Sequence, residues 1–371
     1  MPVVLITGGA GLIGSHVADH LLAHGYSVRA LDTLSTQVHG GERQPPEYLD
    51  ARVELIVGDV RDRDTVRRAL RGADAVFHFA AAVGVGQSMY EVVHYTSVNN
   101  VGTAVLCEAL AERPVRRLVV ASSMSIYGEG LYRRRDGTLV QHVQRPLEQL
   151  RAHRWEPLDD DGEPLEPLPT DEAKAPAVAS VYALSKFDQE RMCLMIGQAY
   201  RLPTVALRFF NVYGPRQALA NPYTGVLAVF ASRYLNGRRP VVFEDGEQRR
   251  DFVSVHDVAE ACRLALEASD ATGQVFNIGS GRSYTVREVA ERLAHVLGRE
   301  EIEPEISGSY RVGDVRHCFA DIRLAGRVLG YAPRVTLDDG LRELAQWLAG
   351  RQPDDRVPQA RAELAERGLT L

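Results

Sequence analysis

The stretch that decides the fold is "VVLITGGAGLIGSHV", residues 3–17. It begins with a short apolar run typical of a strand, and from Leu12 onward apolar side chains recur at helical spacing until Gly25. Gly8, Gly11 and Gly14 lie where the strand would give way to the helix. Glycines at such a turn let the backbone approach a pyrophosphate, whose charge then faces the helix N-terminus. A tight turn that binds nothing is the alternative interpretation.

Two acidic residues follow at the ends of the next predicted strands. Asp32 ends "SVRALD" (27–32), and a carboxylate there bonds ribose hydroxyls and repels a 2′-phosphate, which favours NAD over NADP. Asp59, in "VGDVRD" (57–62), ends the third predicted strand, where the adenine would lie. A helix N-cap or a polar turn is the alternative for Asp59. The glycine loop together with Asp32 predicts NAD as a bound cofactor.

The first half of the chain continues to alternate apolar strands with amphipathic helices. Such alternation predicts an α/β fold, a Rossmann-like doubly wound parallel sheet with right-handed crossovers. We expect a dinucleotide-binding domain at 1–208, with a loop-rich insertion at 129–179. A smaller C-terminal substrate-binding lobe is expected at 209–350, with some segments returning to the sheet. The polar tail, 351–371, is expected to be an appended helix or a mobile segment.

Composition excludes several classes of protein. The 371 residues have a formal charge of −6 and 45% apolar content, which is ordinary for a soluble protein and gives no footprint for nucleic acid. No apolar run is long enough to span a membrane, and no charged leader precedes the first strand. The four cysteines are widely spaced, which argues against a metal site or a disulfide framework. We therefore expect a cytoplasmic protein with no metal, nucleic-acid or membrane partner.

"SVYALSKFDQE", residues 180–190, contains one of the two lysines of the chain. Tyr182 and Lys186 are four residues apart, so on a helix their side chains share one face. An adjacent ammonium favours the phenolate, which would allow Tyr182 to act as a base near neutral pH. An ordinary surface pair is the alternative.

Eight motifs occur in one order along the chain, and together they resemble the extended short-chain dehydrogenase/reductase family of NAD-dependent nucleotide-sugar epimerases and dehydratases. The resemblance runs from residue 3 to about 348. The motifs are "TGGAGLIG", "GDVRD", "HFAAAVGVGQS", "SSMSIYG", "YALSK", "LRFFNVYGPRQ", "RRDFVSVHDVAEA" and "YRVGD".

The resemblance implies a role for each serine of "ASSMSIYG" (121–128). Ser123 would bond the sugar hydroxyl that is oxidised, while Tyr182 takes its proton and Lys186 holds the nicotinamide ribose. Ser125 would point the same way and contact the sugar or Tyr182. Ser122 faces the opposite side of the strand, because strand neighbours alternate, and is expected to be a structural residue or a cofactor contact. The alternative is that these hydroxyls cap nearby backbone groups.

The resemblance also implies the other site residues. The expected cofactor contacts are Gly8, Gly11, Leu12, Ile13, Gly14, Asp32, Asp59, Val60, Ala80, Ala81, Asn99, Tyr182, Lys186 and Phe210. The expected substrate contacts are Ser123, Ser125, Asn211, Arg250, Arg311 and Asp314. The two arginines would clamp a diphosphate, for which a planar guanidinium is suited, and Asp314 would reach the nucleoside ribose. Surface ion pairs are the alternative for the arginines, and plain core or helix-end positions for Ala80, Ala81 and Asn99. A homodimer through helices near 97–112 and 181–200 is implied as well.

Met124 and Ser125 bear on the type of reaction. Family dehydratases have an Asp-Glu pair at these positions, and glucuronate decarboxylases have Glu at the second, so both reactions are disfavoured. Epimerisation at C4 of a UDP- or dTDP-hexose needs only Ser123, Tyr182, Lys186 and the nicotinamide, and it is the predicted activity. The alternative is a nucleotide-4-ketosugar reductase, and a non-catalytic NAD-sensing protein is a further one.

The insertion is the main departure from the family pattern. A long insertion here is similar to that of the dTDP-L-rhamnose 4-epimerase-like branch. Its basic cluster "YRRRDG" (132–137) would be either a lid over a phosphate or a solvated loop, and "DDDGEPLEPLPTDE" (159–172) a solvated acidic turn. Base recognition is expected near residues 225–229 and 241–244.

Overall fold

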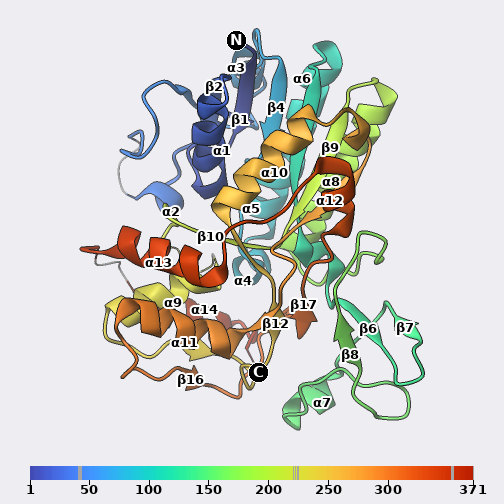
Figure 1. Cartoon of the computed structure of the whole chain (residues 1–371), viewed down its shortest axis with the longest axis vertical. Helices are drawn as coiled ribbons and strands as arrows, with labels where there is room; N and C mark the ends of the chain where they lie inside the picture. Colours follow the sequence, from blue (N-terminus) through green and yellow to red (C-terminus); the bar gives the residue numbers. More distant parts are fainter. Residues whose placement is uncertain (41–43, 220, 222, 224, 352–354, 371) are drawn as a thin grey trace.

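The computed structural model of the chain describes residues 1–40, 44–219, 221, 223, 225–351 and 355–370. Figure 1 shows a sheet with helices on both faces, a smaller lobe beneath it, and a third segment, the insertion, beside that lobe.

The central sheet has seven strands within these residues, in the order β3-β2-β1-β4-β5-β9-β14. Every neighbouring pair in it is parallel. Its strands are β1 (Val3–Thr7), β2 (Ser27–Asp32), β3 (Glu54–Val57), β4 (Ala75–His78), β5 (Arg117–Ser123), β9 (Thr204–Phe209) and β14 (Val275–Ile278). The strand order reverses between β1 and β4, which creates a crevice at the carboxyl ends of these two strands.

Helices cover both faces of the sheet. On one face, buried side chains of α1, α10 and α12 pack on the sheet, and on the other face those of α3, α6 and α8. The predicted doubly wound Rossmann-like fold is therefore confirmed. The helices of this part are α1 (Leu12–Ala23), α2 (Thr36–His39), α3 (Arg63–Ala69), α4 (Val85–Ser88), α5 (Val92–Tyr95), a π-helix (Thr96–Val101), α6 (Gly102–Glu112), α8 (Val181–Ala199), α10 (Val255–Glu267) and α12 (Arg323–Leu329).

The smaller lobe has a core of its own, formed between helices and short strands. Its helices are α9 (Val226–Leu235), α11 (Val286–Leu297) and α13 (Leu337–Leu348). Two of its sheets have two strands: β10 (Asn211–Tyr213) pairs with β13 (Phe252–Ser254), and β11 (Val241–Val242) pairs with β16 (Glu305–Ile306). In a three-stranded sheet, β12 (Arg249–Arg250) lies between β15 (Tyr284–Thr285) and β17 (His317–Cys318). The chain leaves this lobe through β13, and β14 then becomes an edge strand of the central sheet.

The insertion folds into β6 (Leu131–Arg133), β7 (Leu139–Val140), β8 (Glu166–Leu168) and the short helix α7 (Leu147–Arg151). Its basic cluster forms exposed ion pairs with the insertion's own acidic stretch: Arg133 with Glu166, Arg134 with Asp160, and Arg135 with Glu163.

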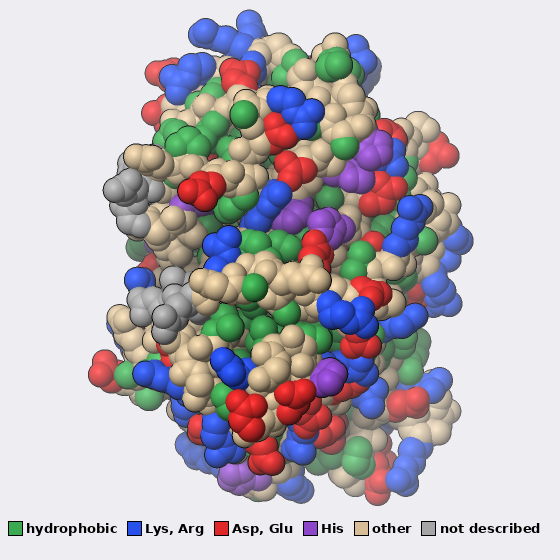
Figure 2. Space-filling model, turned by 60° about the vertical axis from the view of Figure 1, so that its left-hand side comes forward, with side chains coloured by type: hydrophobic (Ala, Val, Ile, Leu, Met, Phe, Trp, Pro, Cys, Tyr) green, Lys and Arg blue, Asp and Glu red, His purple; other side chains and the backbone are tan. Residues whose placement is uncertain are grey.

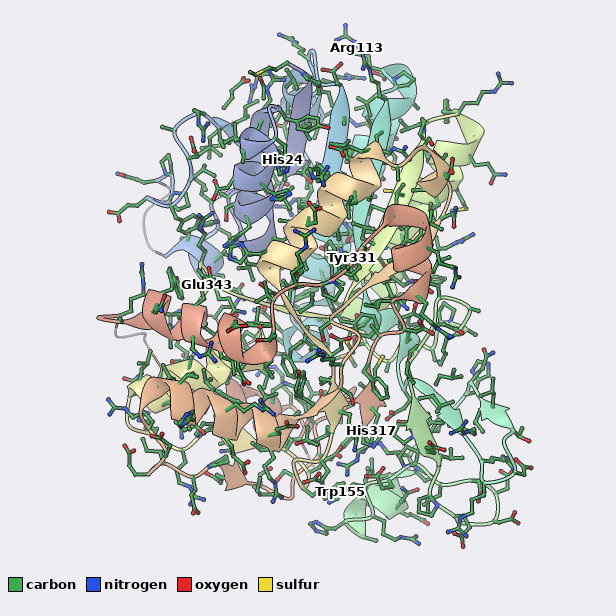
Figure 3. The ribbon with its side chains drawn as sticks, in the orientation of Figure 1. His24, Arg113, Trp155, His317, Tyr331 and Glu343 are labelled. Atoms are coloured by element: carbon green, nitrogen blue, oxygen red, sulfur yellow. The ribbon has the colours of Figure 1, made fainter. Side chains whose placement is uncertain are left out.

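A buried ionic cluster joins the insertion to the smaller lobe. Arg316, which is 1% exposed, pairs with Glu156 of the insertion and with Glu244 of the lobe. Arg145 bonds the second Glu244 oxygen at 2.7 Å. Figure 3 places His317 near this junction, and its Nε2 lies 2.9 Å from Glu156 Oε2.

The described part of the predicted tail contains a helix, α14 (Val357–Glu366), which packs against the lobe. Acidic and basic side chains are interspersed over the face of the molecule in Figure 2. Among the described residues, no helix is both long and apolar enough to cross a lipid bilayer.

Candidate active site

The glycine loop lies at the crevice between β1 and β4. Gly8 has a φ of +71°, and a Cβ on it would lie 2.9 Å from the backbone N of Ala80. A Cβ on Gly14 would lie 2.2 Å from the carbonyl oxygen of Gly8. Both positions therefore require glycine, because any side chain would displace neighbouring backbone.

The first turn of α1 offers backbone N–H groups to an anion. Gly11 is its N-cap, and no side chain bonds the free amides there. A Cβ on Gly11 would meet, among the described atoms other than those of its chain neighbours, only the Gly8 oxygen at 3.5 Å, so space remains at Gly11, next to Leu12 and Ile13, the first residues of α1. This cradle fits the pyrophosphate of a dinucleotide.

Asp32 lies beside the loop at the end of β2. Its carboxylate accepts hydrogen bonds from the backbone N–H of Ala10 at 3.0 Å and of Leu34 at 2.9 Å. His39 Nε2 lies 3.7 Å away. The carboxylate thus holds the loop and stands where a ribose would approach the end of the strand.

Asp59 and Val60 follow β3. Asp59 forms an ion pair with Arg61 at 2.5 Å, and hydrogen bonding by this guanidinium lowers the pKa of the carboxyl. Val60 is buried, and a Cβ on Gly102 would lie 2.7 Å from it. Asp59 is therefore paired locally, and Val60 packs on the π-helix and α6.

Asn99, in the π-helix, is fully buried and joins the cofactor side of the cleft to α8. Its side chain bonds the backbone N and O of Ala82 at 2.7 and 3.1 Å, and it donates to Ser185 Oγ at 2.8 Å. Ala80 and Ala81 are the partly buried residues just before Ala82. π-helical turns often occur at functional sites, because they redirect one side chain.

The structure brings Ser123 and Tyr182 together. Ser123 ends β5, and Tyr182 lies in the first turn of α8, after the N-cap Ser180. Burial raises the pKa of Tyr182, and hydrogen bonding with Ser123 acts in the opposite direction. Ser125 lies in a 3₁₀ turn (Met124–Tyr127) beyond the end of the strand, so strand alternation does not determine its direction as expected. It nevertheless faces the same site, where its Oγ lies 2.8 Å from Ser123 Oγ.

The ammonium of Lys186 bonds Gln189 and makes no hydrogen bond to Tyr182 among the described residues. Its Nζ donates to Gln189 Oε1 at 2.7 Å, and burial lowers the pKa of Lys186 to about 8. Because burial raises the pKa of Tyr182 more than the hydrogen bond with Ser123 lowers it, the expectation of a lowered Tyr182 pKa is wrong.

Gln189 is one end of a buried polar chain that sequence reasoning missed. Its Nε2 donates to Thr103 Oγ1 at 2.8 Å. Thr103 Oγ1 lies 2.8 Å from His78 Nε2, and His78 Nδ1 lies 2.8 Å from Thr7 Oγ1. Thr7 and His78 end the two strands that flank the crevice, so the chain links the crevice to Lys186.

Ser122 lies on the opposite face of β5 from Ser123. Its Oγ donates to Glu190 Oε2 at 2.6 Å, and Glu190 also pairs with Arg208 at 2.7 Å. This buried cluster ties β5 and β9 to α8, so Ser122 has a structural environment.

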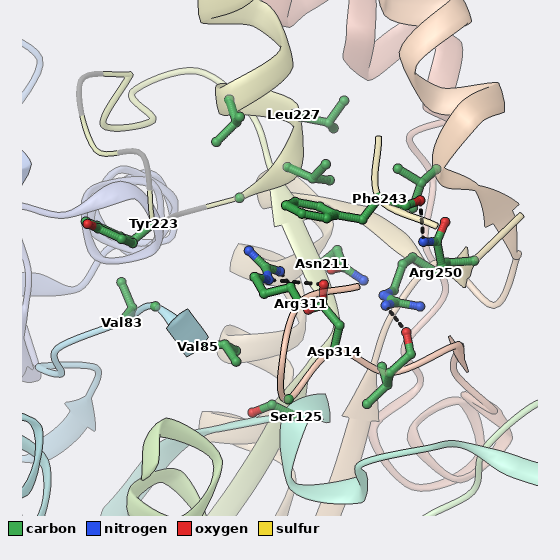
Figure 4. A pocket seen from close by; sticks show the side chains of 18 of the residues that line it. Val83, Val85, Ser125, Asn211, Tyr223, Leu227, Phe243, Arg250, Arg311 and Asp314 are labelled. Atoms are coloured by element: carbon green, nitrogen blue, oxygen red, sulfur yellow. Dashed lines mark hydrogen bonds and ion pairs between the residues drawn. The ribbon is translucent and has the colours of Figure 1, made fainter. Parts of the chain in front are cut away.

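A cavity of about 440 Å³ opens from Ser123, Ser125 and Tyr182 toward the smaller lobe. Figure 4 shows Ser125 at one end, Leu227 and Phe243 at the other, and the pair Arg311–Asp314 between them. All four of the other predicted substrate residues line the cavity, as does Phe210; the four are Asn211, Arg250, Arg311 and Asp314.

An ion pair and hydrogen bonds to backbone oxygens hold the side chains of these four predicted substrate residues in place. Arg311 and Asp314 are paired at 2.7 Å. Arg250 donates to the backbone oxygens of Val315 at 2.5 Å and Arg316 at 2.9 Å. Asn211 Nδ2 donates to the Asp251 backbone oxygen at 2.9 Å. Asp314 is thus engaged by Arg311 before any ribose binds.

Two glutamines in the cavity were not predicted. The Oε1 atoms of Gln217 and Gln248 are buried and have no hydrogen-bond partner among the described atoms. Buried acceptors normally have a partner, so these atoms are suited to a ligand donor. Both residues belong to or adjoin the motifs "LRFFNVYGPRQ" and "RRDFVSVHDVAEA", which is the signal that could have found them.

The doubly wound sheet with a glycine loop at its switch point defines a Rossmann-type dinucleotide-binding protein. More narrowly, the chain belongs to the NAD dependent epimerase/dehydratase family, whose model matches residues 4–153 and 159–279. The family prediction is confirmed, and so is the prediction of NAD as the cofactor.

Named relatives cover nearly the whole chain. A dTDP-L-rhamnose 4-epimerase of Burkholderia thailandensis is 36% identical over 93% of this chain and 94% of its own. The crystal structure of a UDP-glucose 4-epimerase of Thermus thermophilus with NAD is similar with a TM-score of 0.74 at 32% identity, covering 94% of this chain and 99% of its own. That of a UDP-glucose 4-epimerase of Thermotoga maritima with UDP-glucose has a TM-score of 0.76 at 30% identity, covering 94% and 98%. Less similar relatives have the names of a decarboxylase and a dehydratase, so the family hosts several reactions.

Proposed function

We propose that the protein is an NAD-dependent nucleotide-sugar 4-epimerase that acts on a UDP- or dTDP-hexose. The observation that supports it best is the contact of Ser123 with Tyr182 at one end of a cavity whose middle holds Arg250 and Arg311. That layout has a proton-transfer pair at one end of the cavity and two guanidinium groups, suited to a diphosphate, farther along it. The names of the relatives support the same activity.

The chain's residues would act as follows. The Ser123 hydroxyl forms a hydrogen bond with the C4 hydroxyl of the sugar. The Tyr182 oxygen takes the proton of this sugar hydroxyl during oxidation and returns it during reduction. NAD supplies the hydride acceptor and, when reduced, the hydride donor. Lys186 would hold the nicotinamide ribose, and its positive charge would favour the deprotonated form of Tyr182.

Met124 and Ser125 support epimerisation over elimination. Removal of water from C5 and C6 needs an acid and a base beside the sugar. The side chains at these positions are a thioether and a hydroxyl, and neither is suited to that task at neutral pH. The 4-keto sugar therefore has one productive fate in this site, which is reduction from the other face.

The remaining expectations are part of the proposal. The lobe at 209–350 binds the nucleotide, and 1–208 binds NAD. The enzyme is a cytoplasmic homodimer, joined through the expected helices, which are the π-helix, α6 and α8, and to these we add the adjoining α5. Apolar side chains exposed on these helices support the dimer, with Val93 83% and Met195 55% exposed. Val92, Val101 and Leu184 belong to the same apolar set.

The test starts from purified enzyme with its co-purified cofactor. The enzyme is incubated with a panel that includes UDP-glucose, UDP-glucuronate, UDP-N-acetylglucosamine and dTDP-L-rhamnose, with no added NAD. Interconversion of C4 epimers is the expected result. Stoichiometric oxidation of NADH by a 4-ketosugar without epimer exchange would show a reductase instead.

A further inference from the structure

Helix α14 lies along the cavity although the family motifs end before it. Val357, Ala360, Arg361 and Leu364 line the cavity. This spacing places the four side chains on one helical face, and Ala360 and Leu364 on that face are buried.

The start of α14 is fixed beside the apolar end of the cavity. Asp355, two residues before the helix, has a side chain only 5% exposed and accepts hydrogen bonds from Arg233 at 2.9 Å and Arg238 at 3.0 Å. Arg361 lies 3.9 Å from Glu305 of β16, the strand that pairs with β11. The middle of the helix therefore lies near β11, whose Val241 and Val242 also line the cavity.

The end of α14 is fixed beside the catalytic end. Glu363 accepts hydrogen bonds from the phenols of Tyr223 at 2.6 Å and Tyr90 at 3.0 Å, and Tyr223 lines the cavity (Figure 4). Leu364 packs on Gly86 of α4, where an added Cβ would lie 3.2 Å away.

Contact with α4 connects the helix to the catalytic tyrosine. The hydroxyl of Ser88, at the end of α4, accepts a hydrogen bond from the backbone N–H of Tyr182 at 3.0 Å. After α14 the chain turns back, and the oxygen of Leu369 accepts from the backbone N–H of Val312 at 3.0 Å. Thr370 and Arg311 form an isolated antiparallel β-bridge. The segment thus contacts both ends and the middle of the cavity.

Arg361 also changes the charge of the cavity. The charged side chains among its described lining residues are Arg250, Arg311, Arg361 and Asp314, so positive charge is in excess. Asp314 neutralises Arg311, and Arg250 is occupied by backbone oxygens. The ion pair of Arg361 with Glu305, at 3.9 Å, is the longest of these contacts. A long ion pair at the surface contributes little to stability. Its guanidinium is thus available to an anionic ligand.

We propose that α14 is a substrate-binding element: its buried face around Ala360 forms the wall that contacts the nucleoside, and Arg361 bonds the diphosphate. This inference rests on the proposed function, since it assigns a further contact to the same nucleotide-sugar site. It implies that substrate selection depends on a helix outside the region of family motifs.

A pair of matched variants tests the wall. Ala360→Leu enlarges a buried side chain that lines the cavity, and Ala362→Leu makes the same change on the exposed side of the same helix. Calorimetry with UDP and with dTDP is expected to give a dissociation constant at least about 10-fold higher for Ala360→Leu, a loss of about 1.4 kcal/mol, and unchanged values for Ala362→Leu. The NAD content of both variants is expected to equal that of the wild type.

A third variant tests the charge without disturbing packing. Arg361→Gln changes an exposed side chain, so it should fold even if Ala360→Leu does not. It is expected to weaken UDP or dTDP binding and to leave uridine or thymidine binding unchanged. Wild-type nucleotide affinity in Ala360→Leu and Arg361→Gln, with the wild type active on a nucleotide sugar, would overturn the role of α14 alone. A wild type that binds neither UDP nor dTDP would instead overturn the proposed function.

Discussion

The Ser125 hydroxyl donates a hydrogen bond to the Ser123 hydroxyl oxygen, with an Oγ–Oγ distance of 2.8 Å. The backbone N–H of Ser125 donates to the same oxygen at 3.2 Å. Both lone pairs of the Ser123 oxygen are thus engaged, which leaves its own O–H to bond the phenol of Tyr182 or the sugar. We therefore propose that Ser125 acts on the reaction by orienting Ser123.

Replacement of Ser123 should change both the rate and the pH profile. Hydrogen bonding with Ser123 lowers the pKa of Tyr182, so Ser123→Ala raises it. Because the base must be deprotonated, the rising limb of the kcat profile is expected to move to higher pH, and kcat at pH 7 to fall by roughly 100-fold. Ser122→Ala, on the opposite face of β5, is the comparison, and it should leave the position of that limb unchanged. A Ser123→Ala profile that superimposes on the wild type would remove Ser123 from the proton path.

Tyr182→Phe should abolish turnover while the cofactor stays bound. Loss of a general base costs roughly 10²- to 10⁴-fold in kcat. The glycine loop and Asp32 are untouched, so NAD released on denaturation should match the wild-type amount. Tyr200→Phe, at the exposed C-terminal end of α8, provides the matched control and should retain full activity. Retained turnover in Tyr182→Phe would require another base.

Asp32 should govern the choice between NAD and NADP. Asp32→Ala removes the carboxylate that accepts hydrogen bonds from Ala10 and Leu34 and that we propose to bond the ribose. Affinity for NAD is expected to fall about 10- to 100-fold, as for a hydrogen bond to a charged group, and the preference for NAD over NADP to narrow. Fluorescence titration with both dinucleotides measures this, with the exposed Asp64→Asn as the control. An unchanged preference would place the ribose elsewhere.

The ionic cluster of the insertion should make stability depend on pH. Burial alone would raise the pKa of Glu156, but His317 and Arg316 outweigh it and lower the pKa to about 2. A lowered pKa in the folded state adds stability above the ordinary value of 4.5 that disappears as pH falls toward 2.

Glu156→Gln is therefore expected to lower the melting temperature at pH 7, by an amount that shrinks progressively below pH 4.5. Scanning calorimetry at several pH values measures this difference. Glu163→Gln, which breaks an exposed pair with Arg135 in the same insertion, should have little effect at any pH. Equal melting temperatures for Glu156→Gln and the wild type at pH 7 would contradict the stabilising role.

The proposed dimer can be dissociated by charge. Val93→Glu combined with Leu184→Glu places carboxylates on two exposed apolar positions of the proposed interface. Light scattering is expected to give the mass of a dimer for the wild type and of a monomer for the double variant. Leu139→Glu, an exposed apolar position in the insertion, should remain dimeric. A monomeric wild type would contradict the interface.

The glycine loop and the serine alternation were predictable because their causes are local. Glycine is required at position 14 because the backbone oxygen of Gly8, six residues earlier in the sequence, leaves no room for a Cβ. Ser122 and Ser123 face opposite sides of the sheet because neighbouring residues of a strand alternate. The direction of the Lys186 ammonium was not predictable, since helical spacing identifies a shared face and not the partner of the side-chain tip.

Contacts between residues far apart in the sequence explain why other features of the structure were not predicted. Glu156 precedes an acidic stretch that the sequence predicts to be solvated, yet it bonds Arg316, which follows 160 residues later. The polar tail has little apolar periodicity, because α14 buries only Ala360 and Leu364 against a cavity built by other segments. Neither the bond between Glu156 and Arg316 nor the packing of α14 against the cavity could be inferred from neighbouring residues in the sequence.

The position of β14 at the edge of the sheet has a consequence for synthesis of the chain on the ribosome. When the first 208 residues have emerged, β9 is nearly complete but has one unpaired edge, and its partner β14 ends at Ile278. Unpaired edges bind other strands readily, so the nascent sheet is exposed to aggregation while the intervening segment is translated. The two parts of the enzyme must mature together, and a fragment cut at residue 208 would retain the glycine loop and the Ser123–Tyr182 pair on a sheet that lacks its final strand.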